Sequence, residues 1–381
     1  MEEWAGARLL YLDNLKVILV AAIIAIHAVL SYSDFDWWAY AEVREVALSK
    51  VTEVALLMLA APFALIMIPL LFLIAGMLSQ PALARKGPGR FAHDRLIRLG
   101  LPFAVFVLVL WPVLMYALYA ALGSGQVSYR ETFLGTPEEN VDASIMWFVG
   151  VLLIFSLAYA GWARMRHGRP LRQRPVVGPA FLLAMAGMVA IATFLVRLVF
   201  PLGSERYVDL NLFEWPACAA MFGLGIAAAR RGWLTAVPDR LRRQCRTATL
   251  VTAAAFAVVA AYGAVIGGDF EQVWGGGWRW TALAFDTAES ALAVFGPVWI
   301  LGLAQQRLDR RLTWSGPAVS RSAYAAFILQ GFVLIGFAVS LRVVPAPAEV
   351  KALLLAAGGV AGSYALAWLL IRRIPASAWA L

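Results

Sequence analysis

The sequence predicts an all-α integral membrane protein, a bundle of about ten transmembrane helices with both termini in the cytoplasm. Three observations predict this fold class. The 381 residues are 62% apolar and only 14% charged, whereas about a quarter of the residues of a soluble domain are charged. Apolar runs long enough to cross a bilayer recur along the chain. Lys and Arg gather in every second connection between these runs.

Ten apolar runs define the predicted helices in chain order. A helix needs about 20 predominantly apolar residues to cross the hydrocarbon core of a bilayer. Runs of about this length lie near residues 10–31, 55–79, 99–121, 144–162, 177–200, 213–229, 247–267, 281–303, 319–341 and 350–371. The runs that begin near 144 and 213 are the shortest. We therefore expect a single transmembrane domain over residues 1–381, without room for a separate soluble domain.

The basic residues between the runs predict the direction of each helix. The segments 80–98, 162–175, 230–246, 304–321 and 372–381 contain 5, 5, 6, 4 and 2 Lys or Arg, and the alternate segments 31–53, 122–143, 201–214, 268–280 and 342–351 contain 2, 1, 1, 1 and 2. The alternate segments also contain 15 of the 23 acidic residues. Because Lys and Arg are enriched in short cytoplasmic loops, this pattern predicts a multi-pass protein of the cell membrane, an inner or plasma membrane, with cytoplasmic ends.

The charge, the cysteines and the N-terminus narrow the class of function. The net charge is +9, but the basic residues lie in short clusters between apolar runs, which indicates orientation signals rather than a nucleic-acid partner. Two cysteines, Cys218 and Cys245, and three scattered histidines form no metal-site pattern, so no metal is expected. The segment Met1–Leu10 lacks a small-residue cleavage site and is not expected to be a cleavable signal peptide.

A histidine lies deep inside the first apolar run. A titratable side chain at this depth costs several kcal/mol and usually faces the protein interior. Lys16 lies 11 residues before His27, almost three helical turns, so the two side chains share a face about 16 Å apart. Asp13 lies near the same stripe, one turn before Lys16. This alignment predicts a functional His27, the alternative being a histidine hydrogen-bonded to a neighbouring helix for packing alone.

Three further ionisable residues lie in or near the predicted spans. Asp286 and Glu289 are one turn apart in the outer part of the span 281–303, so they face about the same way. Glu289 is a candidate functional residue because unbroken membrane sequence follows it, whereas a later helix start would leave Asp286 in the headgroups. Arg197 lies four residues before Pro201 and is expected to extend to the outer interface.

The densest polar stretch, residues 85–98, lies between the second and third spans. Anchoring of the cytoplasmic side explains its charge. It does not explain why Arg95 and Arg98 lie one turn apart and lead directly into the third span. Because guanidinium groups bind phosphate bidentately, this pair is a candidate site for an anionic ligand at the membrane surface. The two interpretations stay open.

Several sequence motifs along the chain occur in the same order as in one known family of membrane proteins. They are Tyr11-Leu-Asp13-Asn14-Leu-Lys16 with His27 after ten further residues, Pro69-Leu-Leu-Phe-Leu-Ile-Ala-Gly76, Gly87-Pro-Gly-Arg90-Phe-Ala-His-Asp94-Arg95-Leu-Ile-Arg98-Leu-Gly-Leu-Pro102, Met146-Trp147-Phe148, Gly223-Leu-Gly225 with Arg230-Arg-Gly-Trp233, and Tyr324 to Phe332. Together they resemble the membrane-bound acyltransferase 3 family, and within it the branch related to the succinyltransferase that modifies osmoregulated periplasmic glucans (the glucan biosynthesis protein C group). The first motif is similar to the family's basic-x10-His signature.

The chain departs from the family pattern at three positions. Ala288 replaces the tryptophan of a Trp-Glu pair that ends at Glu289. In the segment similar to Tyr-x-x-Tyr-x-x-His, Phe327 replaces the second tyrosine and Gln330 stands where many members have histidine. A glutamine forms hydrogen bonds but does not titrate near pH 7. The last departure therefore bears on the acceptor, or on the activity itself.

The resemblance implies an enzyme that transfers an acyl group such as acetyl or succinyl. The donor would be a cytoplasmic acyl-coenzyme A, a co-substrate rather than a permanently bound cofactor, and the acceptor a hydroxyl of a carbohydrate, glycolipid or similar molecule. His27 would take the proton of the acceptor hydroxyl as general base, with Glu289 as a second catalytic candidate. The remaining candidates are Lys16, Arg95 and Arg98 for the donor phosphates, and Asp13, Trp147, Tyr324 and Gln330 for substrate contacts, with core packing as the alternative for Trp147 and Tyr324.

Two other functions stay open from the sequence. Buried His, Glu and Arg side chains also suit a proton-coupled transporter or exporter, although the two halves of the chain show no convincing correspondence of the kind common in transporters. A family member without activity, acting as a membrane scaffold, is supported only by Gln330. Consumption of acyl-coenzyme A by membranes that contain the protein distinguishes the enzyme from both.

Overall fold

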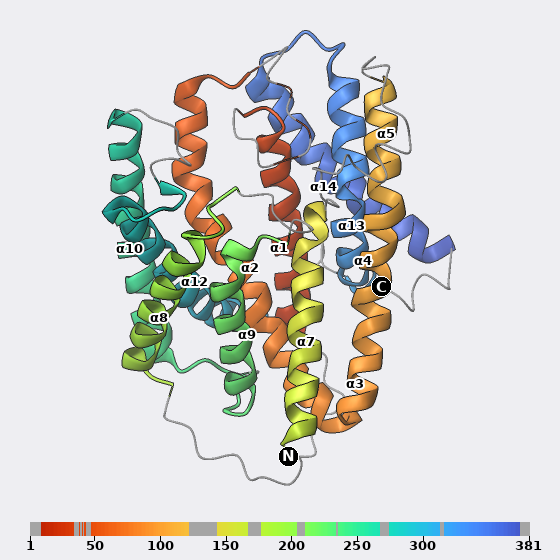
Figure 1. Cartoon of the computed structure of the whole chain (residues 1–381). Helices are drawn as coiled ribbons and strands as arrows, with labels where there is room; N and C mark the ends of the chain where they lie inside the picture. Colours follow the sequence, from red (N-terminus) through yellow and green to blue (C-terminus); the bar gives the residue numbers. More distant parts are fainter. Residues whose placement is uncertain are drawn as a thin grey trace. The chain divides into compact units, whose positions relative to one another are not determined.

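The computed structural model describes residues 9–33, 38, 40, 42, 47–121, 143–166, 177–203, 210–233, 235–266, 274–312 and 316–373. Over these ranges the regular structure is helical, without a strand (Figure 1). The described residues form two compact units, one that runs up to Ala61 and resumes at Ile300, and one that comprises Pro62–Trp299. The boundaries between the units fall inside two helices, α2 (Lys50–Lys86) and α12 (Trp280–Arg307), so each of these helices belongs in part to both units.

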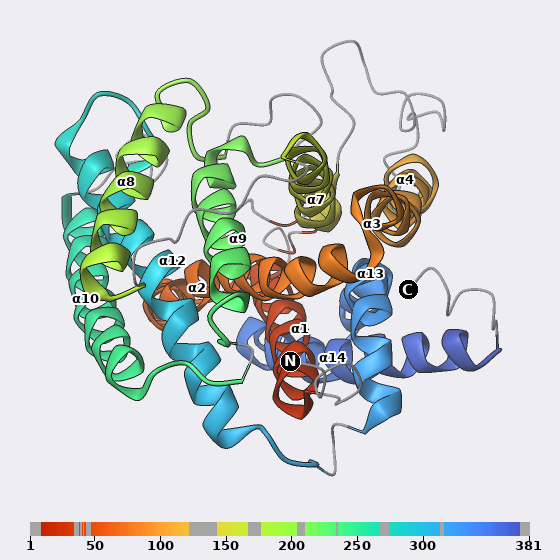
Figure 2. The same cartoon turned by 90° about the horizontal axis from the view of Figure 1, so that it is seen from below.

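Three long helices form the centre of the first unit. They are α1 (Leu10–Leu30), α13 (Pro317–Leu341) and α14 (Ala348–Arg373), and each packs against the other two (Figure 2). Tyr364 of α14 donates a hydrogen bond from Oη to the carbonyl oxygen of Val17 at 3.0 Å. Gly359 of α14 allows a close approach to α13, because a Cβ atom there would clash with Cδ2 of Leu334.

The second unit contains a long rod followed by four helices. In the rod, α3 (Pro88–Arg95), α4 (Leu101–Val105) and α5 (Trp111–Ala121) are joined by π-helical turns over Leu96–Gly100 and Phe106–Leu110 (Figure 1). The helices that follow are α7 (Trp147–Met165), α8 (Pro179–Arg197), α9 (Trp215–Ala229) and α10 (Asp239–Ile266). Short 3-10 turns, Ser144–Met146 and Leu212–Glu214, lead into α7 and α9.

Two glycines let α2 and α9 cross with their backbones in contact. A Cβ atom on Gly225 would lie 2.8 Å from the backbone nitrogen of Met77 and 3.0 Å from Cα of Gly76. Contacts this short are available only to glycine, and small residues are what allow helices to approach closely in membranes. Two of the motifs that carry the family resemblance, Pro69–Gly76 and Gly223–Gly225, thus meet at one helix crossing although they are far apart in the sequence.

The predicted spans agree with the helices. In the part of the chain that the structure describes, nine helices are long and apolar enough to cross a membrane, and each overlaps one of the predicted spans. The tenth predicted span, 247–267, falls on α10 except for its last residue, which lies outside the described residues. The protein is therefore a multi-pass membrane protein, all-helical over the residues that the structure describes. The cytoplasmic position of the termini stays a prediction, and Met1–Arg8 and residues 374–381 lie outside the described residues.

Candidate active site

His27, in the last turn of α1, is hydrogen-bonded to a glutamine of α13. Nδ1 of His27 lies 2.9 Å from Oε1 of Gln330. Gln330 is buried, and its Nε2 donates to the carbonyl oxygen of Phe327 at 3.0 Å, which turns Oε1 toward the histidine. Because an amide oxygen only accepts hydrogen bonds, Nδ1 carries the proton of the neutral imidazole. The basic lone pair is then on Nε2.

An indole ring covers one face of this imidazole. The rings of His27 and Trp38 are stacked, with centroids 4.4 Å apart and planes inclined by 11°. Trp38 is only 6% exposed, and its buried Nε1 has no hydrogen-bond partner among the described residues. Trp38 is not among the candidate residues that the sequence pattern indicates. The available signal was the aromatic pair Trp37-Trp38 in the connection that follows the histidine-bearing span.

The segment that carries Trp38 is tied to the helices of the first unit. The backbone nitrogen of Glu42 donates to the carbonyl oxygen of Ser31 at 2.7 Å. The carboxylate of Glu42 is buried and accepts hydrogen bonds from Nε of Arg342, which follows α13, at 2.9 and 3.0 Å. Nε of Arg342 also lies 3.1 Å from Oη of Tyr40. These contacts fix residues that follow Trp38 to the ends of α1 and α13.

At the other end of α1 the polar stripe is present as predicted. Nζ of Lys16 lies 3.2 Å from Oδ1 of Asp13, and the Lys16 side chain is 42% exposed. Asn14 is buried and donates from Nδ2 to the carbonyl oxygens of Leu308 and Arg310 at 2.7 and 2.9 Å. Since α1 is a continuous α-helix, Lys16 and His27 share a face as the spacing predicts. Lys16 is accessible, and its donor-binding role stays a prediction.

The two arginines predicted to bind the donor have different environments in the second unit. Arg95 donates from Nη2 to Oγ of Ser79 at 3.1 Å, and its guanidinium lies 5.0 Å from the ring centroid of Phe91. Arg98 is exposed, on the π-helical turn that follows α3. Arg95 is thus engaged by its own unit, whereas Arg98 faces outward. Their binding of donor phosphates stays a prediction.

Glu289 belongs to a buried ionic cluster in the second unit. Arg197 of α8 is fully buried and donates to both carboxylate oxygens of Glu289, at 2.6 and 2.9 Å. It also donates to Oδ1 of Asp286 at 2.5 Å. Glu214, before α9, is the third carboxylate, 3.9 Å from Arg197. One guanidinium therefore joins α8, α12 and the turn that enters α9.

This cluster corrects one expectation and adds one residue. Arg197 does not extend to the outer interface, because three carboxylates draw its guanidinium into the protein, where it is fully buried. Asp286 is also buried, since α12 begins at Trp280 and places it almost two turns inside the helix. Glu214 escaped the sequence analysis because it lies at a predicted span boundary, where a carboxylate is usually solvated.

The sequence of nearly the whole chain matches one known protein family. It is the acyltransferase 3 family, described as an acyltransferase domain, and it matches residues 9–372. The chain belongs to this family. It is therefore a membrane acyltransferase by family membership, with an acyl donor and an acceptor in general. No curated protein and no solved structure matches the chain significantly.

Two further residues that the sequence predicts to contact substrate, Trp147 and Tyr324, lie on helices of this acyltransferase. Trp147 is the first residue of α7, in the second unit. Tyr324 lies on α13, six residues before Gln330, and its buried Oη has no hydrogen-bond partner within the described ranges. The family match supports acyl transfer and assigns no function to individual residues. The branch related to the glucan succinyltransferase likewise stays a prediction.

Proposed function

We propose that the protein is an O-acyltransferase that moves an acyl group from a cytoplasmic acyl-coenzyme A to a hydroxyl of a carbohydrate or glycosylated acceptor. His27 is its general base. The observation that carries this proposal is the hydrogen bond between His27 Nδ1 and Gln330 Oε1. It selects the tautomer in which Nε2 is unprotonated and able to accept a proton. A histidine hydrogen-bonded only for packing would have the same tautomer, so the activity of a His27 variant decides between the two functions.

The reaction can be written with the groups that this site supplies. Nε2 of His27 takes the proton of the acceptor hydroxyl while the hydroxyl oxygen attacks the carbonyl carbon of the thioester. The tetrahedral intermediate then collapses, the carbon–sulfur bond breaks and the ester is released. The imidazolium returns its proton to the departing thiolate, which leaves as free coenzyme A. Atoms, charges and protons balance, and His27 ends as it began.

Gln330 is a positioning residue in this scheme. The family's histidine at this position could change its charge near pH 7, whereas a glutamine stays neutral. What the reaction requires of the position is an acceptor for Nδ1–H, and the amide oxygen provides one at 2.9 Å. The departure from the family pattern is therefore compatible with activity, which removes the main support for an inactive scaffold.

Glu289 has a different proposed function. Both of its carboxylate oxygens accept hydrogen bonds from Arg197. Such a bidentate pair stabilises the ionised carboxylate and engages the lone pairs that a general base would use. We assign Glu289 to the buried cluster that joins helices of the second unit, and its direct participation in catalysis is the alternative that a variant tests.

The cellular arrangement follows from the charge pattern of the chain. Lys and Arg alternate between connections as they do in proteins of the cell membrane with cytoplasmic ends. In that orientation Lys16 is near the cytoplasmic face and His27 is deeper on the same helix face. The donor would then enter from the cytoplasm and the acceptor from the other side. The chain resembles the acyltransferase branch that modifies periplasmic glucans, and this resemblance implies an acceptor on the non-cytoplasmic side.

The test uses membranes from cells that express the full chain. They are incubated with acetyl- or succinyl-coenzyme A, the release of free thiol is followed, and glycans and lipids are compared by mass spectrometry for an added acyl mass. Wild type is expected to transfer and His27→Gln to lose transfer by at least about a hundredfold, with an unchanged elution profile in size-exclusion chromatography. Full transfer by the folded His27→Gln protein would remove the histidine from the mechanism.

The same assay separates the enzyme from a transporter. If wild-type membranes release no thiol and add no acyl mass with any donor supplied, the acyltransferase proposal fails. Proton-coupled transport, which the buried Arg197 cluster would also suit, would then be measured directly as substrate uptake driven by a pH gradient.

A further inference from the structure

The turn between α2 and α3 is built around a glycine. α2 ends at Lys86 and α3 begins at Pro88, with Gly87 between them at a φ of 76°. Non-glycine residues rarely adopt this left-handed conformation, and proline suits the first position of the helix that follows. The reversal brings the last residue of α2 beside the first turns of α3. We call Lys86, Gly89, Arg90, His93 and Asp94 the basic elbow.

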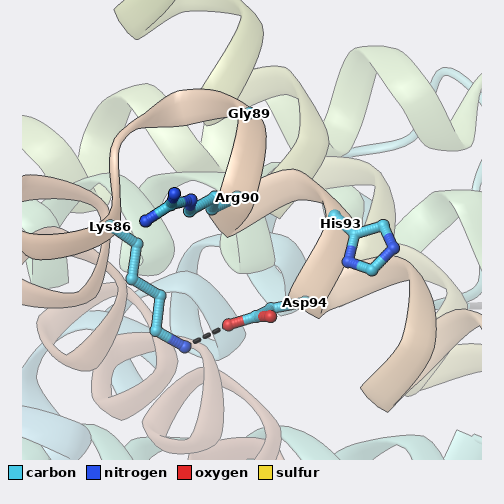
Figure 3. Close-up of a pocket in the computed structure, with 5 residues that line it drawn as sticks. All are labelled: Lys86, Gly89, Arg90, His93 and Asp94. Carbon is cyan, nitrogen blue, oxygen red and sulfur yellow. Dashed lines mark hydrogen bonds and ion pairs between the residues drawn. The ribbon is translucent and has the colours of Figure 1, made fainter.

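These five residues line an open pocket of about 470 Å³ (Figure 3). Figure 3 shows Lys86 and Arg90 extending to the same side of the turn, with Asp94 beside Lys86 and His93 on the opposite rim. A Cβ atom at Gly89 would meet nothing within 4 Å, so the pocket is open at this position. The pocket lies at the first turn of α3, where backbone N–H groups lack partners within the helix.

The charges of the basic elbow are only partly compensated. Lys86 forms an ion pair with Asp94. Arg90 is exposed, and its guanidinium forms no hydrogen bond or ion pair with any described residue. The exposed His93 adds two further nitrogens at the rim. A pocket with two fixed cations and one carboxylate has an excess of positive charge, and its guanidinium is available for a ligand.

We propose that the basic elbow is a binding site for a phosphate group. The guanidinium of Arg90 binds two phosphate oxygens, as its planar fork of donors permits. The ammonium of Lys86 binds a third oxygen and exchanges Asp94 for the phosphate, so Asp94 competes with the ligand. Arg95, from which a phosphate site was expected, contributes less because Ser79 and Phe91 already engage it.

Two sources could supply such a phosphate. One is the acyl donor, since coenzyme A carries a ribose 3′-phosphate and a diphosphate. The other is the headgroup of an anionic lipid, since the elbow lies just before a membrane span. The assignment to the donor rests on the proposed function, whereas the phosphate site itself does not.

The enrichment of Lys and Arg in cytoplasmic loops is an alternative explanation of the basic elbow. It explains the charge of these residues but not their geometry. Positive residues that only anchor a loop need no defined pocket and no left-handed glycine. They also need no specific arginine, because any cation in the loop would serve. Arg85 is the matched control, since it is exposed and adjacent to Lys86 but does not line the pocket.

The experiment measures binding without turnover. Full-length protein in nanodiscs of phosphatidylcholine is titrated with coenzyme A and with dephospho-coenzyme A. In a second arm, the same protein is exchanged into nanodiscs containing phosphatidylglycerol, and retention of that lipid is measured by mass spectrometry. The variants are Arg90→Gln, Lys86→Gln and Asp94→Asn, with Arg85→Gln as control and thermal midpoints as the check on folding.

The expected results discriminate by source and by residue. If the donor supplies the phosphate, Arg90→Gln and Lys86→Gln weaken coenzyme A binding about tenfold or more. Asp94→Asn tightens it, and Arg85→Gln changes it less than threefold. If a lipid supplies it, the same ranking appears in retention of phosphatidylglycerol and not in coenzyme A binding. The proposal is overturned if Arg90→Gln and Arg85→Gln behave alike in both arms.

Failure here is distinguishable from failure of the proposed function. A protein that transfers acyl groups but binds both probes independently of Arg90 and Lys86 refutes the phosphate site alone. A protein that retains phosphatidylglycerol through these residues, yet consumes no acyl-coenzyme A, refutes the acyl transfer alone.

Discussion

The imidazole of His27 and the indole of Trp38 lie face to face, 4.4 Å apart between centroids and nearly parallel. The stack covers one ring face, and Gln330 binds Nδ1 at the edge, so the imidazole is restricted both in tilt and in rotation. In the proposed mechanism the remaining nitrogen of the ring, Nε2, is the atom to which the acceptor hydroxyl comes.

Loss of the stack is expected to lower turnover without preventing folding. Trp38→Ala removes an aromatic pair worth about 0.5–1.5 kcal/mol, so kcat should fall roughly two- to tenfold from misorientation of His27. Trp38→Phe keeps one aromatic ring against the imidazole but removes the pyrrole ring of the indole together with its N–H, so we expect a smaller loss. Steady-state kinetics with acyl-coenzyme A measure both variants, and wild-type kcat in Trp38→Ala would contradict an orienting function of the stack.

Replacement of Gln330 tests its function as an acceptor for Nδ1–H. Gln330→Leu leaves His27 without a partner and frees the tautomer, and we expect kcat to fall about ten- to a hundredfold with little change in the donor KM. Gln330→His restores an acceptor of the family type and should keep activity within a few-fold. The pH profile of kcat/KM is the second readout, since Gln330→His introduces a second titratable ring. Unchanged kcat in Gln330→Leu would contradict the positioning function.

The buried cluster of the second unit should be sensitive to charge. Arg197→Met leaves Asp286, Glu289 and Glu214 without their cation, and breaking a buried ion pair by removing one partner costs about 3–5 kcal/mol. A large fall in the thermal midpoint in detergent, measured by scanning fluorimetry, is expected. Arg164→Met, at an exposed position near the end of α7, is the matched control and should leave the midpoint unchanged.

A Glu289→Gln variant distinguishes a structural function of Glu289 in this cluster from a catalytic one. Glu289→Gln keeps the shape and one acceptor oxygen for Arg197, so a residue of the ionic cluster should lower the thermal midpoint while kcat per folded molecule stays within a few-fold. A catalytic carboxylate would instead lose about a hundredfold or more in kcat. Activity normalised to the folded fraction decides between the two functions.

The crossing of α2 and α9 predicts opposite effects for two nearby glycines. Gly225→Ala drives a methyl group against the backbone of Leu73 and Met77, and overpacking of this kind costs about 1–3 kcal/mol. Gly223→Ala meets nothing within 4 Å and should be neutral or slightly stabilising, because alanine favours a helix over glycine. Thermal midpoints of the two variants test the crossing directly, and similar midpoints would contradict it.

The helices and their order could be predicted from the sequence because the signals are local. A run of about 20 apolar residues must be helical in a bilayer, since only a helix pairs every backbone group within one segment. The same locality places Asp13, Lys16 and His27 on one face of α1, because the rotation between them depends only on the helix period.

The partners of these side chains were decided by tertiary structure. Gln330 is 303 residues from His27 along the chain, and in the sequence it is only a departure from a family motif. Trp38 belongs to a connection whose path no periodicity describes. Arg197 looked like an interfacial residue until Glu289, 92 residues later, was found to bind it.

The sequence by itself therefore determined the membrane class, the helices, the family and the depth of His27 on α1. Tertiary structure alone decided which nitrogen of His27 is basic, which ring covers it and which of the arginines near the turn at Gly87 line a pocket. The physical reason is that helix formation in a membrane depends on nearby residues, whereas hydrogen bonds, stacks and ion pairs between helices depend on how the helices pack.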